Sequence, residues 1–175
     1  ATASVSDQCA SLVFDGNNYV EVSDASGLDL NFSEYTIEAW VRATDIGFLQ
    51  CPYQGAAHSV VYKRGIQGYY LDIRNCNSGS STFRYNSDNS GNDFIGTSQV
   101  ALNQWYHLAI TYSAGVATMW INGSEEGSRA LGPTIDTTHP LRIGHDTQNY
   151  QYPWKGNIRS VRLSSTNRYT SPFSP

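Results

Sequence analysis

The sequence predicts an all-β domain with two packed antiparallel sheets, and three observations lead to this fold class. Aromatic residues make up 13% of the 175 residues and charged residues only 15%, with 15 glycines, a composition typical of β-rich domains. Apolar and polar residues alternate in short runs about every 10 to 15 residues, and no segment keeps a helical period. Turn residues separate these runs. A chain of this length fits one domain, so we expect residues 1–175 to form a single sandwich.

The alternating runs define the predicted strands in chain order. They are 11–16, 19–22, 36–42, 59–63, 69–74, 83–85, 104–113, 116–122, 141–144 and 158–163. Gly65 and Gly68 suit a hairpin turn after 59–63, and Ala114-Gly115 suits another after 104–113. We expect about eleven to thirteen short strands in all. The predicted loops are 45–57, 86–93, 124–139 and 146–154, at the rims where binding usually resides.

Composition also limits the functional class. The net charge is −4, with only 11 Lys and Arg, and phosphate binding needs a basic stripe. No run approaches the roughly 18 apolar residues of a membrane span. Many tyrosines and few charges are typical of secreted β domains. We therefore expect no nucleic-acid partner, no membrane span, and a secreted or cell-surface location.

The three cysteines leave one of them without an internal partner. Cys51 lies in a loop before one strand of the first predicted hairpin, and Cys76 ends the next strand. These two can therefore close a disulfide across the hairpin. Cys9 is then free or paired outside the domain. Spacing alone does not determine this connectivity.

Several segments, taken in order, resemble one known family. They are 11–16 (SLVFDG), 19–22 (YVEV), 35–42 (YTIEAWVR), 61–65 (VYKRG), 68–71 (GYYL), 104–112 (QWYHLAITY), 119–123 (MWING), 154–163 (WKGNIRSVRL) and 168–173 (RYTSPF). Their co-linear order resembles the laminin-G-like branch of the concanavalin A-like lectin/glucanase jelly rolls. The resemblance implies a two-sheet jelly roll that binds a ligand, most often a sugar. The same fold also carries adhesion domains and glucanases, so it does not by itself define a function.

The distribution of acidic residues argues against an enzyme. A retaining glycosidase needs two carboxyl groups about 5–5.5 Å apart, which on one strand requires acids at positions i and i+2 or i+4. Glu21, Glu38 and Asp72 are each isolated on their predicted strands. Glu125 and Glu126 are adjacent, so in an extended chain they point to opposite sides. We therefore expect no catalytic residues.

Histidine and tryptophan side chains on the strands are expected to serve packing. His107 lies on one strand face with Trp105 and Ala109, and a lone His there is usually a packed, hydrogen-bonded core residue. Trp40 and Trp105 are assigned to packing as well. Trp154 aligns with an aromatic residue of the family before the closing glycine, which also favours a structural role over ligand contact.

The oxygen-rich turn at 15–18 (DGNN) indicates a structural calcium site, because Ca²⁺ takes about six to eight oxygen ligands. Related domains often bind calcium between this turn and the closing strand. The resemblance therefore implies a ligand set of Asp15, Asn17, Asn18, Asp146 and Asn157. The family frequently has acids directly after the closing Gly-x-Ile, here 156–158, where this sequence has Arg159 and Ser160, so one expected carboxylate ligand is missing. The alternative is a plain β-turn, for which the residues of 15–18 are favoured.

Two places offer the aromatic faces and planar polar groups that bind sugars. On a sheet face, alternation places Tyr70, Asp72 and Arg74 together, with Arg84 on a neighbouring strand and Trp120 on another. The alternative for this face is a solvent-facing ion pair between Asp72 and an arginine, which contributes little.

The second place is the rim loop 146–154. Its aromatic and amide side chains have no core-like period: Gln148, Asn149, Tyr150 and Tyr152. The sequence therefore predicts a non-catalytic carbohydrate-binding module, part of a larger secreted or surface protein, that stacks a glycan on Tyr150 or Tyr152. A protein-interaction or adhesion domain is the alternative, because Tyr is enriched in protein interfaces.

Overall fold

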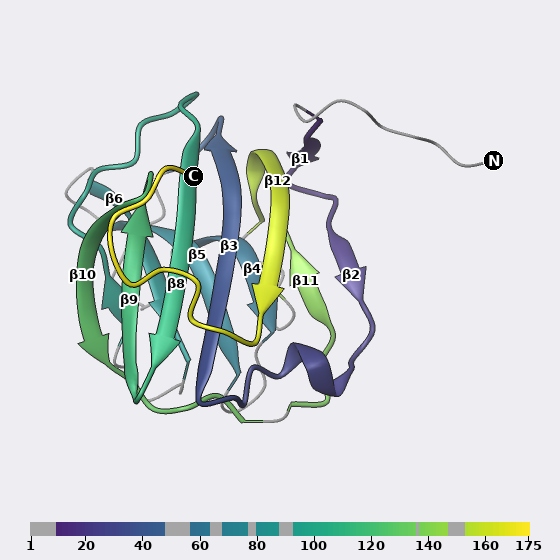
Figure 1. Ribbon diagram of the computed structural model, residues 1–175. Helices are drawn as coiled ribbons and strands as arrows, with labels where there is room; N and C mark the ends of the chain where they lie inside the picture. The colour runs from purple at the N-terminus through teal and green to yellow at the C-terminus, as the bar shows by residue number, and fades with distance from the viewer. Residues whose placement is uncertain are drawn as a thin grey trace.

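Two six-stranded antiparallel sheets pack face to face in the computed structural model (Figure 1), which describes residues 10–47, 57–63, 68–76, 80–87, 93–135, 137–146 and 153–175. The front sheet of Figure 1 has the strand order β1 (Leu12–Asp15), β12 (Lys155–Ser164), β3 (Glu34–Ala43), β8 (Tyr106–Ser113), β9 (Val116–Ile121) and β10 (Ser124–Ala130). The back sheet has the order β2 (Val20–Val22), β11 (Leu141–Ile143), β4 (Ala57–Lys63), β5 (Tyr69–Cys76), β6 (Ser80–Asn86) and β7 (Phe94–Ile95). A short 3₁₀ turn, η1 (Ser26–Leu28), precedes β3. The predicted two-sheet jelly roll is confirmed.

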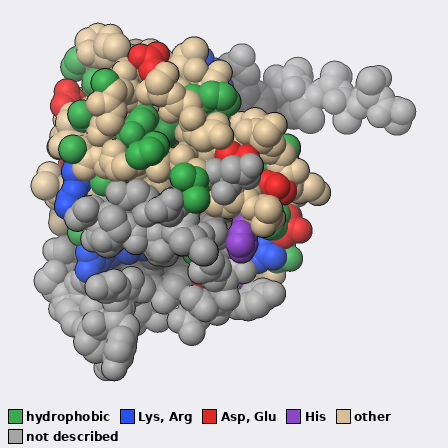
Figure 2. All heavy atoms as spheres, turned by 90° about the horizontal axis from the view of Figure 1, so that it is seen from below, with side chains coloured by type: hydrophobic (Ala, Val, Ile, Leu, Met, Phe, Trp, Pro, Cys, Tyr) green, Lys and Arg blue, Asp and Glu red, His purple; other side chains and the backbone are tan. Residues whose placement is uncertain are grey.

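Charges of both signs lie at the lower end of the sandwich. Figure 2 shows the described Lys and Arg and the described Asp and Glu side chains scattered there among hydrophobic and other side chains. In the part of the chain that the structure describes, no helix is long and apolar enough to cross a membrane.

Alternation along each strand determines which side chains enter the core. In β3, Ile37, Ala39 and Val41 belong to the buried cluster between the sheets. Glu38 and Trp40 take the opposite face, because successive strand residues point to opposite sides. The predicted division of this strand is confirmed.

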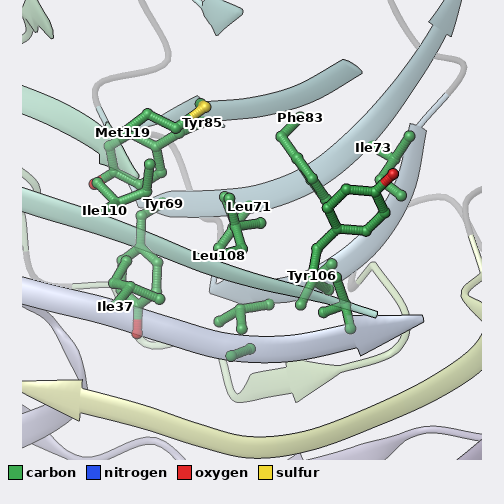
Figure 3. Packing of buried hydrophobic residues seen from close by; sticks show 14 of the residues in the cluster. Ile37, Tyr69, Leu71, Ile73, Phe83, Tyr85, Tyr106, Leu108, Ile110 and Met119 are labelled. Atoms are coloured by element: carbon green, nitrogen blue, oxygen red, sulfur yellow. The ribbon is translucent and has the colours of Figure 1, made fainter. Parts of the chain in front are cut away.

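The core lies between the inner faces of both sheets. Figure 3 shows Ile37, Leu108 and Ile110 of the front sheet packed against Leu71 and Phe83 of the back sheet. Burying one such side chain contributes about 1.5–3 kcal/mol. The outer face of each sheet is therefore left to carry polar groups and binding sites.

The hairpin between β8 and β9 closes through the two-residue turn that the sequence predicts. Ala114 and Gly115 have φ angles of +50° and +81°. A turn with two left-handed residues matches the twist of antiparallel strands. The pairing of Ser113 with Val116 on either side of the turn confirms this hairpin.

The predicted loop 124–139 is wrong over its first part, because Ser124–Ala130 forms strand β10. This strand is the edge of the front sheet and pairs only with β9, with a bulge between Glu125 and Gly127. Polar, exposed residues are common on edge strands because they prevent edge-to-edge association. Such residues leave no apolar alternation to detect. Strand β7 was missed because its two residues are too few to show any alternation.

After β12 the chain turns back and crosses the outer face of the front sheet, over β3, β8 and β9 (Figure 1). We call residues 165–175 the C-terminal segment. Thr36 anchors its start, since its hydroxyl donates to Thr166 O at 2.7 Å and accepts from Arg168 N at 3.1 Å. Near its end, Phe173 N donates to Gly123 O at 2.9 Å.

Candidate functional site

The outer face of the back sheet brings together three of the four side chains predicted to bind sugar there. Arg84 of β6 binds Asp72 of β5 in a bidentate ion pair, with Nε–Oδ1 of 2.9 Å and Nη2–Oδ2 of 2.6 Å. The Arg84 guanidinium also lies 4.9 Å from the ring centre of Tyr70 and 3.0 Å from Asp93 Oδ2. Arg74, the fourth predicted side chain, is half-buried on β5, two residues after Asp72 and opposite Thr82 of β6.

This back-sheet cluster is not an open platform. Tyr70, Asp72 and Arg84 are 4%, 2% and 6% exposed. Burial opposes the charge on Arg84, but the attraction of Asp72 and Asp93 outweighs it and raises the pKa of the guanidinium. The pair is therefore a buried internal link, and the alternative of a solvent-facing pair is wrong about its exposure. Trp120 does not share this face, since it lies on β9 in the other sheet.

Several further predictions fall outside the described residues. The predicted ligand residues Gln148, Asn149, Tyr150 and Tyr152 lie there, as does Cys51. The side chain of Cys76 is likewise not described, so the disulfide stays a prediction. Trp154, at the end of the rim loop, is fully buried and belongs to the core cluster. Its predicted packing role is confirmed.

The predicted calcium turn is closed by its own side chains. Asp15 Oδ1 accepts from Asn17 N at 2.8 Å, and Asn18 Oδ1 accepts from Asp15 N at 3.0 Å. The Asn18 amide nitrogen donates to Val13 O. These bonds are those of a β-turn stabilised by Asx side chains. Asn157, the predicted ligand on β12, donates its amide to Ser11 Oγ at 3.1 Å.

Among the predicted calcium ligands, only Asp146 has a buried side-chain oxygen without a hydrogen-bond partner in the described structure. The residue is 1% exposed, and its Oδ1 has no hydrogen-bond partner within the described structure. This oxygen lies 3.3 Å from His145 Nδ1. A buried carboxylate oxygen without a partner is costly, and a bound cation would satisfy it. Asp146 therefore fits a calcium ligand, whereas Asp15 Oδ1 and Asn18 Oδ1 are already engaged within their turn. Among the described residues, no group of three or more His, Cys, Asp or Glu side chains is arranged to hold a metal ion.

A hollow lies on the outer face of the front sheet, beside the C-terminal segment. It has a volume of about 680 Å³. We call it the outer-face pocket, and the side chains that matter for its chemistry are Glu38, Trp40, His107, Arg162, Arg168 and Tyr169. They come from β3, β8, β12 and the C-terminal segment.

A β-bulge in β12 brings the arginines to this face. Arg159 pairs with Trp40, and Arg162 pairs with Glu38, which lies two residues before Trp40 on β3. Three steps along β12 thus match two steps along β3, so β12 has one extra residue here. Residues three apart on a regular strand face opposite sides, but the bulge places both arginines outward. Ser160 within it has φ of +53°, a left-handed conformation that is uncommon outside glycine. Bulges of this kind are frequent beside functional sites.

Glu38 is the centre of the charged contacts in the pocket. Its Oε2 accepts from Tyr169 Oη at 2.6 Å and lies 3.2 Å from His107 Nε2. Its Oε1 accepts from Arg162 Nε and lies 3.3 Å from Arg168 Nε. Burial opposes ionisation, but the bonds from His107, Arg162 and Tyr169 outweigh it and lower the pKa of Glu38 to about 2. Glu38 is therefore ionised throughout the ordinary pH range.

Aromatic rings border the charged groups. Trp40 is half-buried, with its ring 5.3 Å from the His107 ring in an edge-on contact. The guanidinium of Arg159 lies 5.1 Å from the ring centre of Trp40 and 4.7 Å from that of Trp105. The two tryptophans thus pack around an arginine at the surface.

His107 is buried and bonded, as predicted, but not in the core between the sheets. It lies beneath the C-terminal segment, where its ring packs edge-on against Tyr169 and Phe173 at 6.4 and 5.7 Å. The sequence prediction missed this arrangement because it depends on a segment that returns from the end of the chain. The sequence offered one signal for this pocket, which is the occurrence of Arg159 and Arg162 three residues apart on one predicted strand. This spacing indicates a common face only if a bulge lies between the two arginines.

Two facing antiparallel sheets with an aromatic and charged pocket on one outer face define a lectin-like jelly roll. A family model described as the concanavalin A-like lectin/glucanases superfamily matches residues 14–170. The chain belongs to this family, in its laminin G branch. No curated protein sequence matches the chain.

Solved structures with the same fold include binding domains of carbohydrate-active proteins. Domain 4 of an extracellular arabinanase from Geobacillus stearothermophilus, in complex with arabinotriose, superposes with a TM-score of 0.64 at 19% identity, over 88% of this chain and 69% of that chain. The CBM40 of a Ruminococcus gnavus IT-sialidase, bound to α2,3-sialyllactose, has a TM-score of 0.55 at 13% identity, over 87% and 92%.

Domains LG4-5 of the mouse laminin α1 chain superpose with a TM-score of 0.61 at 13% identity. The match covers 94% of this chain but only 46% of that one. All three identities are low, so these likenesses show a shared fold.

Proposed function

We propose that the chain is a non-catalytic carbohydrate-binding domain that holds a glycan in the outer-face pocket. One observation carries the proposal: the half-buried ring of Trp40 borders the same hollow as the guanidinium groups of Arg162 and Arg168. An aromatic face stacks on the apolar side of a sugar ring, and planar donors bind its oxygens. The fold shared with domains bound to arabinotriose and sialyllactose supports this function.

The state of the carboxylates supports binding without catalysis. A general acid for glycoside cleavage needs a pKa near the working pH. Glu38 instead has a pKa of about 2 and is held by four neighbouring side chains. Asp72, an acid on the outer face of the back sheet, is buried in its pair with Arg84. Neither group is placed to protonate a leaving oxygen.

The remaining predictions extend this proposal. Tyr150 and Tyr152 in the rim loop would provide a second stacking surface for the glycan. The predicted location of the chain outside the cell would match that of the extracellular arabinanase. A structural calcium ion would bind Asp146, whose buried Oδ1 needs a partner. Calcium would supply charge compensation and rigidity to the rim, without a chemical step. A disulfide between Cys51 and Cys76 would fit a secreted domain.

Calorimetric titration of the chain with a panel of neutral and acidic oligosaccharides tests the proposal. We expect weak binding, because a shallow pocket buries little ligand surface. Trp40→Ala should weaken it about five- to ten-fold, the usual contribution of one aromatic stacking contact. Phe32→Ala is the matched control, since this exposed aromatic residue lies outside the pocket lining.

Two outcomes would reject the proposal. One is the lack of binding to every member of the panel at millimolar concentration. The other is capture of a protein target that persists after enzymatic removal of the target's glycans, which would indicate the protein-interaction alternative.

A further inference from the structure

The charges around the outer-face pocket do not balance. Arg162 and Arg168 both contact the same oxygen of Glu38, so one carboxylate faces two guanidinium groups. This local excess of positive charge stands out in a chain whose net charge is −4, and it contrasts with the scattered charges at the end of the sandwich shown in Figure 2.

Both arginines have several N–H donors besides the one that contacts Glu38. Each guanidinium carries five N–H donors in a planar fork; Nε contacts Glu38 in both, and both groups also interact with the hydroxyl of Tyr169. The side chains of Arg162 and Arg168 remain 50% and 35% exposed. A planar carboxylate is the group that such a fork binds best, through two parallel hydrogen bonds.

If Arg162 and Arg168 served only to hold Glu38 in place, their arrangement would be less fully explained. Glu38 already has His107 and Tyr169 as partners on its Oε2, so a single arginine on Oε1 would satisfy the carboxylate. The bulge and the left-handed Ser160 carry a conformational cost. They bring Arg162, the more exposed of the two arginines, to the outer face beside Arg168.

We infer that the outer-face pocket recognises an acidic sugar, a uronate unit within a polysaccharide, and this inference rests on the proposed function. The uronate carboxylate binds between Arg162 and Arg168, while the sugar ring lies against Trp40. Glu38 orients both guanidinium groups from below and stays ionised while it does so. Selection for the carboxylate thus comes from the two arginines, and general affinity for sugar comes from the ring.

The test compares oligogalacturonates with the same oligosaccharides after reduction of their carboxylates to alcohols, both titrated into the full chain. We expect the reduced sugars to bind at least ten-fold more weakly, as for loss of a charge-assisted bidentate contact. Arg162→Gln and Arg168→Gln should each remove most of that difference. Lys155→Gln, which deletes a surface charge elsewhere on β12, should preserve it.

Arg162→Lys and Arg168→Lys keep the charge that holds Glu38 and guard against loss of folding in the Gln variants. They should retain only part of the preference, because an ammonium cannot form the two parallel bonds. Equal affinity for acidic and reduced sugars would overturn the acidic ligand and leave carbohydrate binding intact. An acidic preference that survives in all four arginine variants would place recognition elsewhere. Absence of binding to both series and to the wider neutral panel would remove the proposed function itself.

Discussion

Arg162 of β12 lies opposite Glu38 of the neighbouring strand β3, although the register that brings Arg159 opposite Trp40 would place Val161, one position earlier, there. The extra residue of the bulge therefore decides which side chain meets the carboxylate. It replaces Val161 by a guanidinium that binds Glu38 Oε1. The contact between Arg162 and Glu38 in the outer-face pocket depends on this one irregularity.

Glu38→Gln should lower the free energy of unfolding by about 2 kcal/mol, because a charged hydrogen-bond acceptor with several donors is lost. Urea denaturation monitored by tryptophan fluorescence measures the change. Glu34→Gln is the matched control, since Glu34 is exposed and bonds only to Ser113 Oγ in the described structure. Equal effects of the two substitutions would contradict the central role of Glu38.

The stability of the protein should depend on Glu38 at acidic pH. Its pKa falls from 4.5 in the unfolded chain to about 2 in the folded one, so its contribution is complete above pH 4.5 and is lost as the pH falls toward 2. The difference in unfolding free energy between the protein and Glu38→Gln should shrink over this interval. A difference that is constant from pH 6 to pH 2 would exclude the assigned pKa.

Gly123→Ala should detach the end of the C-terminal segment. A Cβ at Gly123 would lie 1.8 Å from Phe173 O, and the residue has φ of +79°. Gly115→Ala is the matched control, because Gly115 has φ of +81° with open space around it. Gly115→Ala should cost about 1 kcal/mol from backbone strain alone, and Gly123→Ala clearly more. Thermal unfolding and proteolysis of the C-terminal segment would measure both, and equal losses would mean that the contact with Phe173 adds nothing.

Breaking the Asp72–Arg84 pair should be far more harmful than replacing it. Arg84→Met leaves the buried Asp72 carboxylate uncompensated and should cost about 3–5 kcal/mol. The double variant Asp72→Leu/Arg84→Met removes both charges and should recover part of that loss. A double-mutant cycle by chemical denaturation provides the measurement. Simple additivity of the two single effects would show that the buried pair is not coupled.

Calcium should raise the melting temperature by roughly 5 °C, through preferential binding to the folded state. Asp146→Asn should abolish the increase, because it removes the charge at the unpartnered Oδ1. Melting curves with calcium and with excess chelator make the comparison, with Asp45→Asn as a control at an exposed surface pair. Identical curves under both conditions would reject the calcium site.

Much of the fold could be predicted from local patterns. The alternation in 36–42 predicted the inward face of β3, and Ala114-Gly115 predicted the hairpin turn of β8 and β9. The polar strand β10 escaped prediction because an edge strand with exposed polar residues has no apolar face to detect. The site was predicted less well, because Tyr70, Asp72 and Arg84 are indeed neighbours but satisfy one another in a buried cluster.

The sequence by itself determined most of the strands, the inward face of β3 and the family, because these follow from alternation with a period of two and from turn chemistry within a few residues. The tertiary structure alone decided the outer-face pocket. Arg162 reaches Glu38 only through a shift in strand pairing. Tyr169 lies 131 residues after Glu38 in the sequence and reaches it only because the chain returns over the outer face of the front sheet. Such contacts depend on which distant segments pair and in what register, and local periodicity carries no record of either.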